Sequence, residues 1–219
     1  MPCNLKISRN YYHHDFSPTP SLDDKITIFD DRVRGWLIDM VDEMINTSCA
    51  IHPGLASHGG FAALMTLASY FETLAKMRAG YCREGRSSAY FTKGLDWVFP
   101  AKFSEEEARL VYREVRCGLY HAAITGPRVV LSATYSEALS CQPDISGTFV
   151  VANPHLLPKV LRGHLESYVK DLRDRNAATL RTNFERYFDC WAVDRPRWFR
   201  RGSQNRQALS QVGYCIKQS

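Results

Sequence analysis

The segment FAALMTLASYFETLAKM, residues 61–77, is apolar around most of the circumference that it would have as an α-helix. Its apolar side chains recur at three- and four-residue steps, which is the period of an α-helix, at Leu64, Leu67, Ala68, Phe71 and Leu74. A helix without a continuous polar face must pack among other elements. The segment therefore predicts the central, most buried helix of a mainly α-helical bundle.

Amphipathic segments on both sides of it predict helices that cover this centre. Residues 30–48, DDRVRGWLIDMVDEMINTS, carry one apolar face, and residues 156–175 and 177–193 are amphipathic in the same way. Residues 80–100 contain three glycines and a proline around SSAYFTKGLDWVF, which predicts a loop followed by a short helix.

The most secure helix start lies in residues 103–123, FSEEEARLVYREVRCGLYHAA. Ser104 and Glu107 have the spacing of a capping box, and three consecutive glutamates fall where the helix dipole favours negative charge. Two runs rich in β-branched residues follow, PRVVLSATY at 127–135 and GTFVVANP at 147–154. We expect them to form a small antiparallel pair inserted between helices.

These patterns divide the chain into three parts. We expect a polar leader at residues 1–24, a helical domain at 25–194 with its β insertion at about 127–152, and a tail at 195–219. The tail has basic residues and no acidic one, and aromatic side chains alternate with its arginines. This composition suits an RNA backbone with stacked bases, although a polar tail without a ligand is the alternative. The predicted RNA-binding residues are Arg195, Arg197, Trp198, Phe199, Arg200 and Arg201.

Composition excludes several classes of protein. The 28 Lys and Arg against 23 Asp and Glu give a net charge of +5, which permits an anionic partner without demanding one. The seven cysteines are scattered and odd in number, which argues against a zinc site and against a disulfide scaffold. No apolar run approaches the roughly 18 residues that cross a bilayer. We therefore expect a cytoplasmic protein with no membrane partner, no metal and no cofactor.

Arg116 and His121 pose a geometric problem. On an ideal helix, residues five apart point about 140 degrees away from each other. Gly118, between them, could loosen the turn, or a second copy of the same helix could bring two arginines and two histidines together around a two-fold axis.

Such a cluster supports RNA cleavage without metal. A histidine that titrates near neutral pH can take the proton from a ribose 2′-hydroxyl or give one to the leaving 5′-oxygen. An arginine can hold the negative charge that develops on the phosphate, because its guanidinium is planar, always charged and bidentate.

The motif RCGLYH, Arg116 to His121, has the form R-x-G-L-x-H and resembles the R-x-x-x-x-H signature of the HEPN superfamily. The resemblance implies a small helical domain, a homodimer with a composite active site, and a metal-independent endoribonuclease. It implies catalytic roles for Arg116 and His121, with Glu72, Cys117 and Tyr120 as supporting residues. It also implies products with 2′,3′-cyclic phosphate ends, a toxin–antitoxin or antiviral defence context, and an antitoxin or effector protein as partner.

Other interpretations of these residues stay open. Arg116 could extend from a helix end, with His121 as a partly buried cap, and Cys117 with His121 could form a thiolate and imidazole pair. Glu72 could reach solvent or an arginine from the edge of its apolar helix, or it could orient a catalytic group. Many HEPN-like domains serve instead as non-catalytic dimerisation, RNA-binding or nucleotide-binding modules, a role that Cys117, in a place that is often polar, fits.

Overall fold

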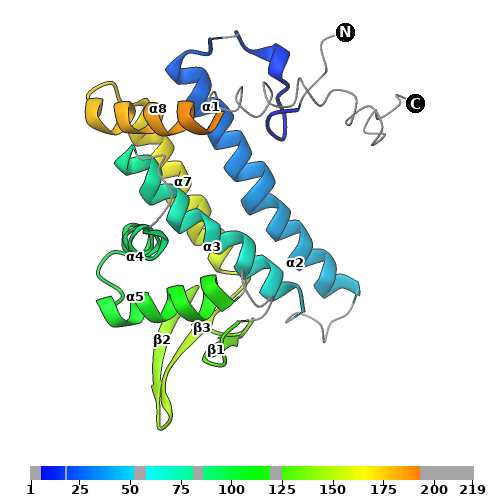
Figure 1. Cartoon of the computed structure of the whole chain (residues 1–219). Helices are drawn as coiled ribbons and strands as arrows, with labels where there is room; N and C mark the ends of the chain where they lie inside the picture. Colours follow the sequence, from blue (N-terminus) through cyan, green and yellow to red (C-terminus); the bar gives the residue numbers. More distant parts are fainter. Residues whose placement is uncertain (1–5, 18, 52–57, 81–85, 119–124, 193–219) are drawn as a thin grey trace, which may run out of the picture.

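The computed structural model describes residues 6–17, 19–51, 58–80, 86–118 and 125–192. Within these ranges the protein is mainly α-helical with one small sheet, as the sequence predicts. Figure 1 shows the helices gathered around α3 (His58–Ala79), with the sheet on one side of the bundle. The finer division into leader, domain and tail stays a prediction.

One long rod runs along α3. It consists of α1 (Leu22–Val33), the π-helical turn η2 (Arg34–Ile38) and α2 (Asp39–Ile51), which follow one another without a break (Figure 1). α3 then returns antiparallel to α2. The predicted central helix is confirmed, because Leu67, Phe71 and Leu74 are at most 1% exposed.

A glycine sets how closely α4 (Ser87–Val98) crosses α3. A Cβ at Gly94 would lie 1.8 Å from the carbonyl oxygen of Phe71, so the two backbones touch at this point. Phe91, one turn earlier, packs edge-on against Phe71 with ring centroids 5.3 Å apart. The crossing therefore holds α4 at a fixed position across α3.

α5 (Glu105–Val111) begins at the predicted capping box. The Glu107 N–H donates to Ser104 Oγ at 3.2 Å, and the Ser104 N–H donates to Glu107 Oε2 at 2.8 Å. The helix continues as a second π-helical turn, η3 (Tyr112–Cys117). The motif residue Arg116 lies in this turn.

The predicted strand pairing is wrong in detail. β1 (Val129–Leu131) and β3 (Gly147–Ala152) are parallel, and the antiparallel partner of β3 is β2 (Leu139–Asp144), in the segment that separates the two β-branched runs. β2 has few β-branched residues and contains Pro143, so composition did not mark it as a strand. Pro143 is tolerated because β2 is an edge strand, and a two-residue turn joins it to β3.

α7 (Leu157–Arg173) and α8 (Ala178–Ala192) complete the bundle, as predicted. Lys25 of α1 joins the rod to α8, with its Nζ 2.7 Å from Glu185 and 2.8 Å from Asp189.

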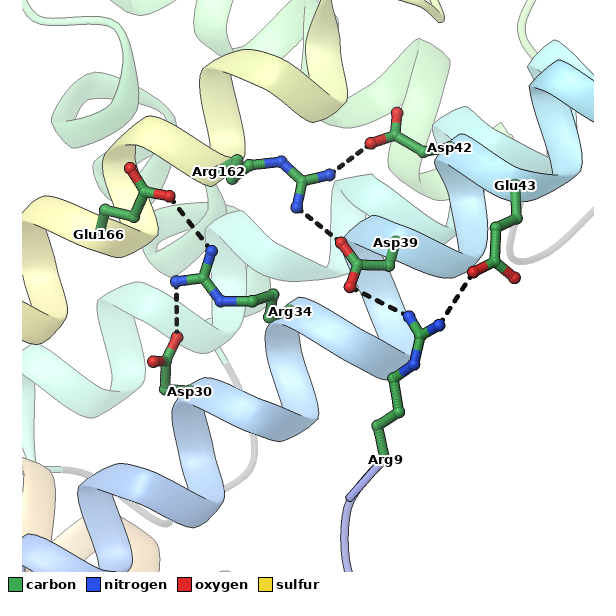
Figure 2. Close-up of polar contacts among 8 residues, drawn as sticks. All are labelled: Arg9, Asp30, Arg34, Asp39, Asp42, Glu43, Arg162 and Glu166. Atoms are coloured by element: carbon green, nitrogen blue, oxygen red, sulfur yellow. Dashed lines mark hydrogen bonds and ion pairs between the residues drawn. The ribbon is translucent and has the colours of Figure 1, made fainter.

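Ion pairs hold α7 against the rod (Figure 2). Arg162 of α7 pairs with Asp39, at 2.6 Å, and with Asp42. Arg34 of η2 pairs with Asp30 at 3.0 Å and with Glu166 of α7 at 3.2 Å. Because every one of these pairs except Arg34 with Asp30 joins α7 to the rod, the network fixes the position of α7 along the rod.

The N-terminal segment joins the same network. Arg9 reaches Asp39 and Glu43, each at 3.0 Å (Figure 2). Its side chain crosses Gly35, where a Cβ would lie 2.5 Å from that of Arg9. Ile7 and Phe16 pack against the core on either side of this contact.

Cys190 is disulfide-bonded, and its partner is neither Cys117 nor Cys141, which both have free thiols. The scattered cysteines did not predict this covalent link.

The buried Tyr70 of α3 contacts the half-buried His164 of α7, with the phenol oxygen 2.8 Å from Nδ1. Burial and the nearby Arg78 cation together lower the pKa of His164 to about 4, against the opposing effect of Asp171. His164 is therefore neutral at physiological pH, and the neighbouring rings of Tyr70 and Tyr168 pack against an uncharged imidazole.

The crossing of α3 and α4 predicts the effect of a single methyl group. Gly94→Ala should lower the free energy of unfolding by about 3 kcal/mol or more, because backbone cannot yield as a side chain can. Gly163→Ala is the matched control, since nothing lies within 4 Å of a Cβ there. It should stabilise helix α7 by up to about 1 kcal/mol. Urea denaturation of both variants measures this, and equal stabilities would contradict the close crossing.

The buried imidazole predicts a dependence of stability on pH. Because the pKa of His164 is about 4 in the folded chain and near 6.5 in the unfolded one, only the unfolded chain takes up this proton between those values. Stability should fall as pH falls through this window, by about 2 kcal/mol once solvent screening of the half-exposed ring is allowed for. His164→Gln should remove this slope from denaturation curves, and His14→Gln, in the exposed N-terminal segment, should retain it.

Candidate functional site

Four side chains from three elements meet around one carboxylate. Glu72 of α3 accepts from Lys76 Nζ at 2.6 Å and from the Ser87 hydroxyl at 2.9 Å, both on Oε1. Arg116 of η3 approaches the other oxygen, with its Nη2 3.4 Å from Oε2. We call Glu72, Lys76, Ser87 and Arg116 the Glu72 cluster. The structure therefore brings together two of the predicted site residues, Glu72 and Arg116.

The Glu72 cluster is partly shielded from solvent and carries one net positive charge, from one carboxylate and two cations. The side chains of Glu72, Lys76 and Arg116 are 13%, 17% and 21% exposed. Burial alone would raise the pKa of Glu72, but hydrogen bonds from Lys76 and Ser87 and the charges of Lys76 and Arg116 lower it below its usual value. Glu72 is therefore ionised at neutral pH.

The π-helical turn brings residues five apart in the sequence onto one face. The Gly118 N–H donates to the Arg113 carbonyl, five residues earlier, in place of the usual four. Tyr112 and Cys117, also five apart, share a side-chain hydrogen bond, which an ideal helix would prevent. This pair has the same spacing as Arg116 and His121.

Aromatic rings border the Glu72 cluster. Lys76 Nζ lies 5.9 Å from the centroid of the Tyr90 ring, and the Tyr112 ring packs edge-on against Phe91 at 5.4 Å. Burial raises the pKa of Tyr112, and the hydrogen bond with Cys117 raises it further. Burial and the Glu72 charge raise the pKa of Tyr187 to about 12. Both phenols are therefore neutral at physiological pH.

Glu114, which lies in η3 together with Arg116, has a buried carboxylate. Glu114 is 5% exposed and pairs with Arg113 at 3.0 Å and with Arg128 at 3.4 Å. Its carbonyl accepts from the Gly126 N–H at 2.8 Å, and a Cβ at Gly126 would lie 1.8 Å from its carboxylate. Glu114 therefore connects η3 to Gly126 and Arg128, which precede β1.

The structure does not cover every predicted site residue. Cys117 is half-buried and contacts Tyr112, a partner that the sequence did not predict. His121 and Tyr120 lie outside the described residues, and so do the predicted RNA-binding residues of the tail, Arg195, Arg197, Trp198, Phe199, Arg200 and Arg201.

Sequence reasoning missed three residues of the site. Lys76 had a readable signal, because it follows Glu72 by four residues on the same helix. Ser87 and Glu114 had none, since the first depends on the crossing of α4 and the second on packing around Gly126.

Comparisons with known proteins identify no relative. No protein family, no curated protein and no solved structure matches the chain. Among the described residues, no group of three or more His, Cys, Asp or Glu side chains could hold a metal ion. In the same part of the chain, no helix has both the length and the apolar character needed to span a membrane.

The Glu72 cluster predicts a loss of stability that depends on pH. Glu72→Gln should lower the free energy of unfolding by about 1 kcal/mol at pH 7, because two partly buried cations lose their counterion in a solvent-screened setting. A carboxylate with a lowered pKa stabilises the fold above its unfolded pKa, so the difference should vanish as pH falls below about 4.5.

The matched control for Glu72→Gln is Glu105→Gln on α5. Glu105 also pairs with a residue four positions away, Arg109, but its side chain is 77% exposed. Its replacement should change stability by less than about 0.5 kcal/mol. Equal effects of the two substitutions in urea titrations would show that burial adds nothing to the Glu72 pairs.

Proposed function

We propose that the protein is a metal-independent endoribonuclease of the HEPN type. The observation that supports the proposal is the contact of Glu72 with Arg116. A carboxylate from the most buried helix holds the arginine of the R-x-x-x-x-H motif, and the surrounding cluster keeps a net positive charge. A half-buried guanidinium in a positively charged cluster suits the recognition of a phosphate.

In this mechanism Arg116 is the phosphate anchor. Its guanidinium binds the scissile phosphate and stabilises the charge that develops as the ribose 2′-hydroxyl attacks. Glu72 acts as a positioning residue, because its contact fixes the direction from which the guanidinium approaches. Lys76 adds a second positive charge close to the same carboxylate.

His121 is the general acid or base of the proposal. The resemblance assigns it this role, and the contact of Tyr112 with Cys117 in η3, which has the same five-residue spacing, supports it. Attack by the 2′-hydroxyl yields a 2′,3′-cyclic phosphate and a 5′-hydroxyl. We propose RNA as substrate, a homodimer as the active form, and a toxin–antitoxin or antiviral defence context with an antitoxin or effector partner.

A second candidate function is a non-catalytic RNA-binding or dimerisation module that serves a partner effector. The contacts of Cys117 with Tyr112 and of Arg116 with Glu72 favour it, because both side chains have partners within the protein. In that case the motif stabilises the helix and performs no chemistry.

RNA cleavage in EDTA separates the two functions. The full-length protein should cut RNA without metal, and mapped ends should be 2′,3′-cyclic phosphates and 5′-hydroxyls. His121→Ala and Arg116→Ala should each lower the rate by a factor of about 100 or more. Glu72→Gln should lower it by a smaller factor, about 10, since it acts through Arg116.

Arg109→Ala is the matched control, because Arg109 lies two turns before Arg116 on the same helix and its side chain is 65% exposed. It should cut at the wild-type rate. Circular dichroism and melting curves must show that each variant is folded. If folded wild-type protein is as inert as His121→Ala but still binds RNA, the binding module is the correct function. Equal cleavage by all variants would mean that these residues do not carry the activity.

A further inference from the structure

Large apolar side chains are exposed together on one side of the bundle. Among the described residues, seven large apolar side chains are exposed, and four of these lie on the neighbouring helices η2–α2 and α3. Trp36 and Met40 on the rod are 44% and 48% exposed, and Phe61 and Met65 on α3 are 41% and 37% exposed. We call these four residues the apolar face.

The helical spacing makes the apolar face continuous. The members of each pair are four residues apart, so each pair lies on one side of its helix. A pocket of about 250 Å³ opens between the two helices, lined by Trp36 and Leu37 from the rod and by Ser69, Thr73 and Met77 from α3. An exposed apolar surface of this kind on a folded protein marks an interaction site.

Two polar residues of α3 beside the apolar face, Thr66 and Ser69, are neutral and have partners in their own helix. The Thr66 hydroxyl donates to the Ala62 carbonyl at 2.8 Å, and the Ser69 hydroxyl donates to the Thr66 carbonyl at 2.7 Å. Covering these groups therefore leaves no new unsatisfied donor, and no charge has to be buried at the centre.

Opposite charges lie at the two ends of the stripe on the rod. Arg32 lines the pocket beside Trp36, four residues before it. Glu43 follows Met40 by three residues, and its side chain pairs with Arg9 but is still 68% exposed. The order along the rod is thus cation, Trp36, Met40 and anion.

We propose that the apolar face is the contact surface between two copies of this chain. A two-fold axis between Trp36 and Met40 sets the rods antiparallel, so that Trp36 meets the partner's Met40 and Arg32 meets the partner's Glu43. Each copy then offers the same surface, as a two-fold interface requires, and both ends pair opposite charges. Parallel rods would instead place like charges together.

The pocket gives the partner's Met40 a place to bind. A methionine side chain is unbranched and flexible, so it fills an irregular pocket beside Trp36 without strain. Trp36, which is large and central in this arrangement, should then contribute most of the binding energy. The proposed interface does not depend on ribonuclease activity. Its test measures only the mass of the protein in solution, so the two proposals can fail separately.

Sedimentation equilibrium over a concentration series tests the interface. Wild-type protein should have twice the 25.0 kDa mass of one chain. Trp36→Glu and Met65→Glu should each weaken the dimer by a factor of about 100 or more, because they bury unpaired charge at the centre. Ile145→Glu is the matched control, since Ile145 is fully exposed at the tip of the β2–β3 hairpin. It should leave the dimer unchanged.

A charge exchange tests the antiparallel register. Glu43→Arg alone should weaken the dimer by a factor of about 10, and Arg32→Glu alone should do the same. The double variant should recover most of the wild-type affinity, because the exchanged charges meet again across the two-fold axis. Arg32 also donates to the Ile7 carbonyl and Glu43 also pairs with Arg9, so melting curves must show that all three variants are folded at the assay temperature.

Three results would overturn the proposal. The first is a wild-type monomer at every concentration up to about 100 μM. The second is a dimer that Trp36→Glu leaves intact, which would place the interface elsewhere. The third is a monomer that dimerises only after residues 193–219 are removed, which would make that segment the occupant of the apolar face.

Discussion

The contact between Gly94 and the Phe71 carbonyl determines how the rest of the site is assembled. Because α4 touches the backbone of α3 there, its first turn carries Ser87 to Glu72 and Tyr90 to Lys76. The same crossing places Phe91 between Phe71 and Tyr112, and so links α3 to the π-helical turn of the motif. A bulkier residue at position 94 would therefore disturb both the core and the Glu72 cluster.

The π-helical turns η2 and η3 lie where side chains make contacts that a regular α-helix would not allow. η2 contains Gly35, which leaves room for Arg9 to reach Asp39 and Glu43, and η3 holds the Tyr112 and Cys117 pair. A π-helical turn is a costly departure from the regular helix that persists where other contacts require it. In η2 those contacts are ion pairs, and in η3 they include the Glu72 cluster.

Local signals explain what could be predicted from the sequence. The apolar period of residues 61–77 and the Ser104 capping box involve neighbours within one helix, so the pattern contains the information, and both predictions are confirmed. β2 was missed because sheet pairing joins distant residues and because Pro143 is a residue that argues against a strand in the sequence. Glu72 and Arg116 could be named, but their contact depends on the packing of α3 against η3, which no spacing in the sequence records.

If the proposed function holds, the hydrogen bonds of Glu72 let Arg116 serve the fold and also bind a phosphate. Lys76 and Ser87 contact Oε1 at 2.6 and 2.9 Å, whereas Arg116 contacts Oε2 at the longer distance of 3.4 Å. Under the proposed function, a phosphate that draws Arg116 away breaks the weakest of the three contacts. Glu72 keeps two partners and is not left as an unpaired buried charge, which would be costly. The arrangement therefore lowers the cost of moving Arg116 from carboxylate to phosphate, and the nearby Lys76 cation favours the bound anion.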